Sequence, residues 1–148
     1  MTKPPPITLD YARSFVDVAM LEFDFLIERG FTLSEVRPTQ SISFRDGFHL
    51  RYSGRSVDLV VNYYDMELVP VFHRGAQQCD YYFLDQHLFA NASGFHGAMF
   101  PLNKLAAALH VVATDVRENF EPVLSGDNAT WQKIAALLNA PRVKRGLP

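Results

Sequence analysis

The stretch SVDLVVNYYDMELVPVFH, residues 56–73, decides the fold class of this chain. β-branched and aromatic residues recur in both of its halves with a period near two, which is typical of β-strands. Asp65 and Met66 separate the two halves, and a link of two residues joins antiparallel strands. Pro70 has no N–H to donate, so we expect the second strand to lie at a sheet edge or to carry a bulge there. The stretch therefore predicts a β-hairpin.

A second hairpin is predicted just before this stretch. Its strands are SISF, residues 41–44, and FHLRY, residues 48–52, and its turn is RDG, residues 45–47. Asp46 and Gly47 supply the turn because both residue types tolerate a positive φ. In the second of these strands the alternation places Phe48, Leu50 and Tyr52 on one face and His49 and Arg51 on the other.

The chain continues into DYYFLDQHLF, residues 80–89. This segment is expected to form a further strand, or a strand that runs into a helical turn. Neighbouring strands joined by short turns favour an antiparallel order over a parallel one. We therefore predict an antiparallel meander of about five or six strands.

Helices are predicted on both sides of the meander. Residues 9–30 have polar positions at helical spacing, with Thr8 as N-cap and Gly30 as the residue that ends the helix. Residues 102–120 form a second helix, which Pro122 ends or kinks. A short last helix follows Ser125 or Asp127, either of which can cap it. Its Trp131, Ile134, Ala135 and Leu138 are expected to face inward.

These elements together predict an α+β fold. An N-terminal helix precedes the sheet, and two C-terminal helices pack largely on one sheet face. Residues 8–140 are expected to form a single domain. The Pro-rich residues 1–7 are expected to be a mobile lead-in, and residues 141–148 a solvated basic tail.

Composition narrows the class of protein. The chain has 148 residues, of which 48% are hydrophobic, and a formal charge of −2, so we expect neither a nucleic-acid nor a membrane partner. A single cysteine excludes an internal disulfide, and the N-terminal segment has no apolar run of the signal-peptide kind. We therefore expect a cytoplasmic protein.

Two short motifs carry a resemblance to known proteins. FDFLIERGF, residues 23–31, ends a helix on Gly-Phe, and VLSGDNATWQKI, residues 123–134, places Gly-Asp ahead of the last helix. With the order of elements, they resemble a loose family of small, mostly uncharacterised bacterial proteins, some of which are similar to immunity proteins of polymorphic toxin systems. The resemblance implies a non-enzymatic protein, an immunity protein or antitoxin that covers a partner toxin, with no catalytic residue and no cofactor. In physical terms Gly30 permits a left-handed cap and Phe31 fills the core beneath it.

Two surfaces are candidates for partner binding. The polar stripe of the first helix carries Asp10, Asp17, Asp24 and Glu28, which would steer a basic partner such as a nuclease toxin and would serve solubility equally well. The paired tyrosines place Tyr64 and Tyr82, with Val60 and Leu84, on the outer sheet face. That face is either open to a partner or covered by the last helices or a dimer mate.

A chemical alternative concerns residues 72–89, which hold the only cysteine and two histidines. Asp85 and His87, two apart, would share a strand face, and with His73 and His96 would line a pocket of a metal-binding protein or small enzyme. Cys79 is a candidate nucleophile without an evident base. The structural interpretation is the end of one strand, a Gly-containing turn and the start of the next. A homodimeric protein without a ligand is the third possibility.

Overall fold

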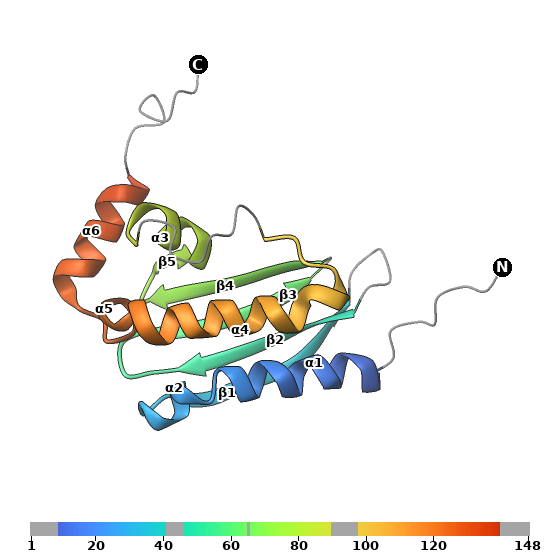
Figure 1. The fold of residues 1–148 in the computed structure, drawn as a ribbon. Coiled ribbons are helices and arrows are strands. Elements are labelled where there is room, and N and C mark those ends of the chain that lie inside the picture. The colour runs from blue at the N-terminus through green and yellow to red at the C-terminus, as the bar shows by residue number, and fades with distance from the viewer. Residues whose placement is uncertain (1–8, 41–45, 65, 90–97, 140–148) are drawn as a thin grey trace, which may run out of the picture.

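The computed structural model describes residues 9–40, 46–64, 66–89 and 98–139, and its fold is α+β (Figure 1). The predicted lead-in, residues 1–7, and tail, residues 141–148, lie outside these ranges. In chain order the elements are α1 (Leu9–Glu22), α2 (Phe25–Glu28), β1 (Thr32–Gln40), β2 (Asp46–Ser53), β3 (Asp58–Tyr64), β4 (Glu67–Arg74), β5 (Gln77–Asp80), α3 (Tyr81–His87), α4 (Leu102–Asn119), α5 (Glu121–Leu124) and α6 (Asn128–Leu138). The predicted fold class is confirmed.

The sheet is an antiparallel meander in the order β1-β2-β3-β4-β5. The hairpin predicted from residues 56–73 is β3 and β4, with Tyr64 opposite Glu67 and Met66 at a φ of 66°. On its other side β4 pairs with β5 only from Val71 onward. Pro70 therefore has no β5 neighbour, but β4 lies between β3 and β5 and its register with β3 is regular, so the predicted edge strand or bulge was wrong.

The first strand differs from the prediction. β1 spans Thr32–Gln40, whereas the predicted strand, residues 41–44, lies outside the described residues. Asp46 and Gly47 are ladder residues opposite Gln40 and Thr39, so their assignment to the turn was wrong. The register of β1 shifts between Leu33 and Glu35, and this irregularity interrupts the period of two that marks a strand in a sequence.

The N-terminal helical region is divided into two helices. α1 ends at Glu22, and the short α2 follows after a turn. Gly30 has a φ of 93°, its N–H donates to the Ile27 carbonyl at 3.0 Å, and the Phe31 N–H donates to the Leu26 carbonyl at 2.9 Å. Both bonds belong to the Schellman motif, and Phe31 is buried. The predicted cap at Gly30 is confirmed, but it ends the short α2 and not a single helix over residues 9–30.

Residues 80–89 follow the second of the two predicted alternatives, a strand that runs into a helix, and most of them are helical. β5 ends at Asp80, whose carboxylate accepts a hydrogen bond from the Phe83 N–H at 2.9 Å and so caps α3. Tyr81, Leu84 and Asp85 are buried at the i, i+3, i+4 spacing of a helix face. The high strand propensity of Tyr and Phe masked this signal, and the cap decides the local structure.

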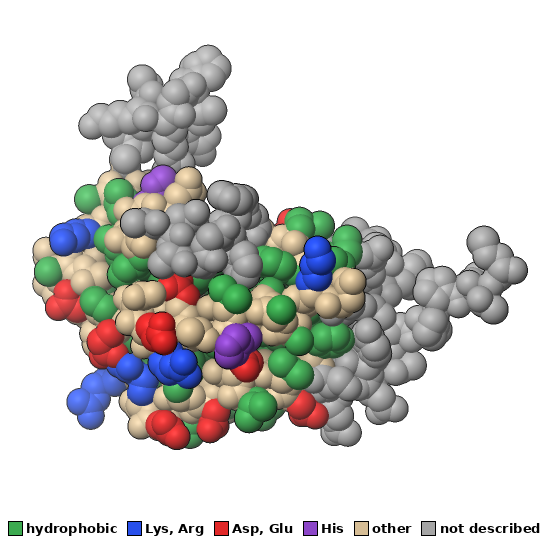
Figure 2. Space-filling model, viewed as in Figure 1, with side chains coloured by type: hydrophobic (Ala, Val, Ile, Leu, Met, Phe, Trp, Pro, Cys, Tyr) green, Lys and Arg blue, Asp and Glu red, His purple; other side chains and the backbone are tan. Residues whose placement is uncertain are grey.

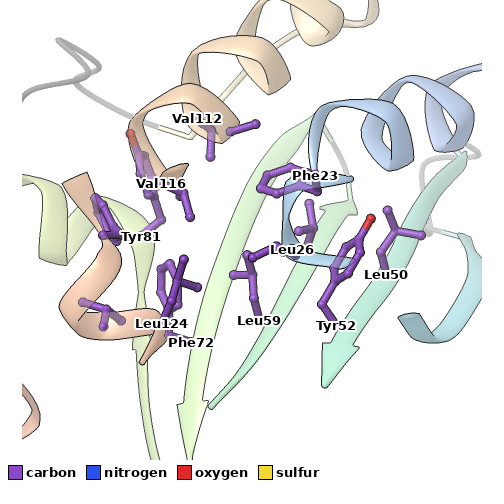
Figure 3. Packing of buried hydrophobic residues seen from close by; sticks show 14 of the residues in the cluster. Phe23, Leu26, Leu50, Tyr52, Leu59, Phe72, Tyr81, Val112, Val116 and Leu124 are labelled. Carbon is purple, nitrogen blue, oxygen red and sulfur yellow. The ribbon is translucent and has the colours of Figure 1, made fainter. Parts of the chain in front are cut away.

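All helices of the described chain contribute buried side chains to one cluster on one face of the sheet (Figures 1 and 3). The sheet supplies Phe48, Leu50, Tyr52, Leu59, Val61, Tyr63, Leu68 and Phe72 to this core. The largest helical contribution comes from α4, with Leu105, Leu109, Val112 and Val116. The core therefore lies between the helices and one face of the sheet, as predicted.

The C-terminal helices follow the predicted breaks. α4 ends at Asn119, and Pro122 lies in the first turn of the short α5. Asp127 is the N-cap of α6: its carboxylate accepts from the Thr130 hydroxyl at 2.7 Å and the Thr130 N–H at 3.0 Å, which lowers the pKa of Asp127. Leu138 was expected to face inward, but its side chain is exposed at the end of α6.

No helix within the described ranges has both the length and the apolar character that a membrane crossing requires.

The Gly30 cap can be tested by substitution. A Cβ at this position would meet no atom within 4 Å, so Gly30→Ala adds only the strain of a positive φ. We expect it to lower the free energy of unfolding by about 1 kcal/mol, and Gly30→Asn to lower it by less, because asparagine tolerates this region better. In urea unfolding, the free energy of unfolding should decrease from the unchanged protein to Gly30→Asn and then to Gly30→Ala. Equal stability of all three would show that the cap contributes nothing.

Candidate functional site

Three of the four residues predicted to line one pocket are described, and they do not form a common site. His73 is on β4, Asp85 is buried on α3, and His87 is exposed on α3 with its ring centroid 4.6 Å from that of Phe83. On a helix, residues two apart point in nearly opposite directions, so the shared strand face of Asp85 and His87 was wrong. His96 lies outside the described residues. Among described residues, no three His, Cys, Asp or Glu side chains are grouped so as to hold a metal ion.

Cys79 lies in the core and not in a reactive position. It is on β5 opposite Phe72, and its side chain is buried. Burial, with a smaller effect of the Asp80 carboxylate, raises the pKa of the thiol to about 12. A nucleophilic cysteine needs the opposite shift, because the thiolate is the reactive form. The environment of Cys79 is therefore that of a structural residue.

The predicted tyrosine patch is also dispersed. Tyr64 is 42% exposed at the end of β3, as expected for an outer-face residue. Tyr82 is on α3, where it is half-buried and its hydroxyl donates to the Leu68 carbonyl. Val60 is buried within the sheet, and Leu84 belongs to the core. Of the four side chains, only Tyr64 is available to a partner.

The sheet face opposite the core carries a network of polar side chains. His49 contacts the Asn62 amide oxygen through Nδ1 at 2.6 Å and the Glu35 carboxylate through Nε2 at 2.7 Å. Beside it, the Arg51 guanidinium donates twice to one Asp58 oxygen, at 2.7 and 2.9 Å. Both ring nitrogens of His49 are therefore engaged within the sheet. The network fixes strands β1, β2 and β3 to one another.

His73 lies on this same face, opposite Asp58. Partial burial and the nearby Arg51 guanidinium lower the pKa of His73, and the Asp58 carboxylate opposes them. The ring is therefore biased toward its neutral form. It does not contribute a further positive charge that would attract an anionic partner to this face.

The structure describes the side chains of three of the four residues of the predicted acidic stripe. Asp17, Asp24 and Glu28 are all exposed, and none forms an ion pair with a described residue. Asp17 lies on α1, Asp24 in the turn that follows α1, and Glu28 at the end of α2. Asp10 is in α1, on the same sequence spacing, and the structure does not describe its side chain. Figure 2 shows acidic and hydrophobic side chains side by side along the lower edge, over α1 and α2.

Leu21 stands in the middle of this stripe. It is four residues after Asp17 and three before Asp24, and 75% of its surface is exposed, the largest value among the exposed hydrophobic side chains of the described chain. We name Asp17, Leu21, Asp24 and Glu28 the Leu21 stripe. Sequence reasoning missed Leu21 because it counted only charged positions on this face. The available signal was an apolar residue at the i+4 position of a polar stripe.

The charges beside the Leu21 stripe are used to hold the helices in place. Glu22 accepts from Nδ1 of His110 on α4 at 2.8 Å, which joins α1 to α4. Arg29 forms an ion pair with Glu121, which joins the end of α2 to α5. These contacts hold α1 and α2 against α4 and α5, and neither of them uses a carboxylate of the stripe.

Comparison with known proteins adds no assignment. No protein-family model matches the chain, and no significant similarity to a curated protein or to a solved structure is found. The resemblance to immunity proteins therefore stays a prediction.

The burial of Cys79 can be tested with a thiol reagent. At about pH 8, near the usual thiol pKa, we expect native Cys79 to resist a disulfide-exchange reagent and to react fully after unfolding in urea. As matched control, Gln78→Cys in a Cys79→Ala background places a thiol on the exposed neighbouring residue and should react at once. Equal rates in the two native proteins would contradict the raised pKa.

The raised pKa of Cys79 also predicts how the stability of the protein changes with pH. Because the folded pKa is the higher one, the contribution of the thiol to stability is complete below the unfolded pKa, and it is lost as pH rises toward about 12.

Proposed function

We propose that this protein acts by binding another protein through the Leu21 stripe, as an immunity protein or antitoxin does, without catalysing a reaction. The observation that carries the proposal is the large exposure of Leu21 among three carboxylates that form no ion pair with a described residue. The partner that fits is a basic protein with an apolar recess. The residue pattern and the resemblance of residues 23–31 and 123–134 support the same assignment, and we place this activity in the cytoplasm.

Leu21 and the three carboxylates of the stripe would contribute differently to the complex. Burying the Leu21 side chain fully stabilises a complex by about 1.5–3 kcal/mol, enough for an anchor residue. The carboxylates around it raise the rate of encounter with a basic partner and exclude acidic ones. Because they are exposed, salt screens them over roughly 10 Å. We therefore expect fast, salt-sensitive association and slow dissociation that depends on Leu21.

A basic toxin is favoured over a second copy of the chain. Two identical stripes facing each other across a two-fold axis would bring Asp17, Asp24 and Glu28 against like charges, which costs free energy. Glu22 and Arg29, the flanking charges, are already engaged within the protein. A toxin whose active site is basic, as in a nuclease, offers the opposite field, and the bound stripe would cover that site.

The test begins with the product of the reading frame that neighbours this gene. We expect that product to be basic, to arrest growth when expressed alone, and to be neutralised by co-expression of this protein. In binding measurements by calorimetry, Leu21→Ala should weaken the complex about tenfold. Leu138→Ala, which shortens another exposed leucine on α6, is the matched control and should change the affinity little.

Charge is tested separately from the anchor. Asp24→Asn should slow association at low salt and have little effect at high salt, whereas Glu67→Gln, at an exposed position on β4, should not slow it. A neighbouring product that is harmless, or a complex equally weakened by Leu21→Ala and Leu138→Ala, would rule the proposal out.

A further inference from the structure

A cavity of about 380 Å³ opens where three distant segments of the chain meet. Residues 29–31 follow α2, residues 54–56 join β2 to β3, and residues 121–125 include α5. In Figure 1 these segments come together at the lower left of the molecule, below the end of α4. Figure 2 shows Lys or Arg side chains gathered in the same region. The volume is in the range of sites for small organic ligands.

The segments that form this cavity are packed closely against one another. A Cβ added to Gly54 would lie 2.6 Å from both the Phe31 ring and the Val57 carbonyl oxygen. A Cβ added to Gly126, whose φ is 71°, would lie 2.8 Å from Cβ of Ser56. The two glycines therefore allow the β2–β3 turn to pack against both other segments. Arg29 and Glu121, both in the lining of the cavity, form an ion pair.

The polar groups of the lining favour an anion. Arg29 and Arg55 contribute two guanidinium groups and Glu121 one carboxylate, so the formal charge of the lining is positive. Arg29 is held by Glu121, whereas Arg55 is exposed and forms no ion pair with a described residue. Ser56 adds a hydroxyl group, whereas the hydroxyl of Ser125, also in the lining, donates to the Pro122 carbonyl at 3.3 Å. Guanidinium and hydroxyl donors together are typical of sites that bind phosphate.

The rest of the lining is apolar. Phe31 and Leu124 are both buried and both contribute to the cavity wall. An anion alone would leave this part of the cavity without a matching surface. A ligand with an apolar, planar body next to its charged group would contact both parts.

We propose that this cavity binds a small phosphate monoester with an aromatic body, with Arg55 as the principal contact of the phosphate group. A phosphate has three terminal oxygens, and these can accept twice from the Arg55 guanidinium and once from the Ser56 hydroxyl, whereas a carboxylate has only two oxygens. Glu121 lies in the same lining and repels the ligand, so it limits the affinity. This inference does not depend on the Leu21 stripe, and its test needs no partner protein.

Phenyl phosphate is the probe, and the readout is the amide spectrum of ¹⁵N-labelled protein. We expect saturable shifts centred on residues 54–57 and 124–126, and weaker binding of inorganic phosphate and of benzoate. Arg55→Ala should weaken the binding of phenyl phosphate about tenfold. Arg37→Ala removes an exposed arginine on β1, outside the cavity, and should leave it unchanged.

A gain of affinity separates a binding role from structural damage. Glu121→Gln removes the repelling carboxylate and frees the Arg29 guanidinium, so it should tighten the binding of phenyl phosphate several-fold. The spectrum of each variant without ligand shows whether the fold is kept. The proposal is overturned if no saturable shift occurs, if inorganic phosphate or benzoate binds as tightly as phenyl phosphate, or if Arg55→Ala and Arg37→Ala behave alike. Weaker binding by a folded Glu121→Gln protein would overturn it as well.

Discussion

The ring of Phe120 joins parts of the molecule that are far apart in the sequence. It is fully buried, with its centroid 5.5 Å from that of Phe72 on β4, 5.3 Å from that of Tyr81 on α3, and 4.4 Å from that of Phe89. The same residue ends α4 and precedes α5. Aromatic contacts of this kind stabilise a core beyond the area that they bury. The position of α5, and of everything attached to it, depends on this ring.

Two polar contacts around Phe120 complete the arrangement. Asp115, buried one turn before it, accepts from the Tyr81 hydroxyl at 2.5 Å and so ties α4 to α3. The Trp131 indole N–H donates to the Val123 carbonyl at 3.1 Å and ties α6 to α5. With these bonds made, Glu121 is held where Arg29 can reach it. The cavity at residues 29–31, 54–56 and 121–125 is thus a consequence of how the aromatic core is packed.

The sequence predicted the elements whose signals are local. The β3–β4 hairpin lies in a run of Val, Tyr and Phe, and the caps at Gly30 and Asp127 rest on the conformational freedom of glycine and on a short carboxylate side chain. β1 was missed because its register shift breaks the alternation that defines a strand. For residues 80–89 the strand preference of Tyr and Phe left two alternatives open, and the Asp80 cap favours the strand that runs into a helix.

The site residues were harder to predict because they depend on distant packing. The acidic positions followed from helical spacing, but Leu21 is notable only when the structure shows that nothing covers it. Asp85 and His87 were paired on the assumption of a strand, and the helix separated them. The cavity has no sequence signal, since its three segments are joined only in space and its glycines serve close packing between them.

The Leu21 stripe and the cavity meet at two consecutive residues, Glu28 and Arg29. Neighbouring residues on a helix point about 100° apart, so the last turn of α2 sends one charge outward along the stripe and the other toward the cavity. Glu121 then neutralises Arg29, which would otherwise weaken the negative field of the stripe. A phosphate bound beside Arg29 would add negative charge at the same end of the molecule. Ligand binding in the cavity would therefore strengthen, and not oppose, the attraction of a basic partner to the stripe.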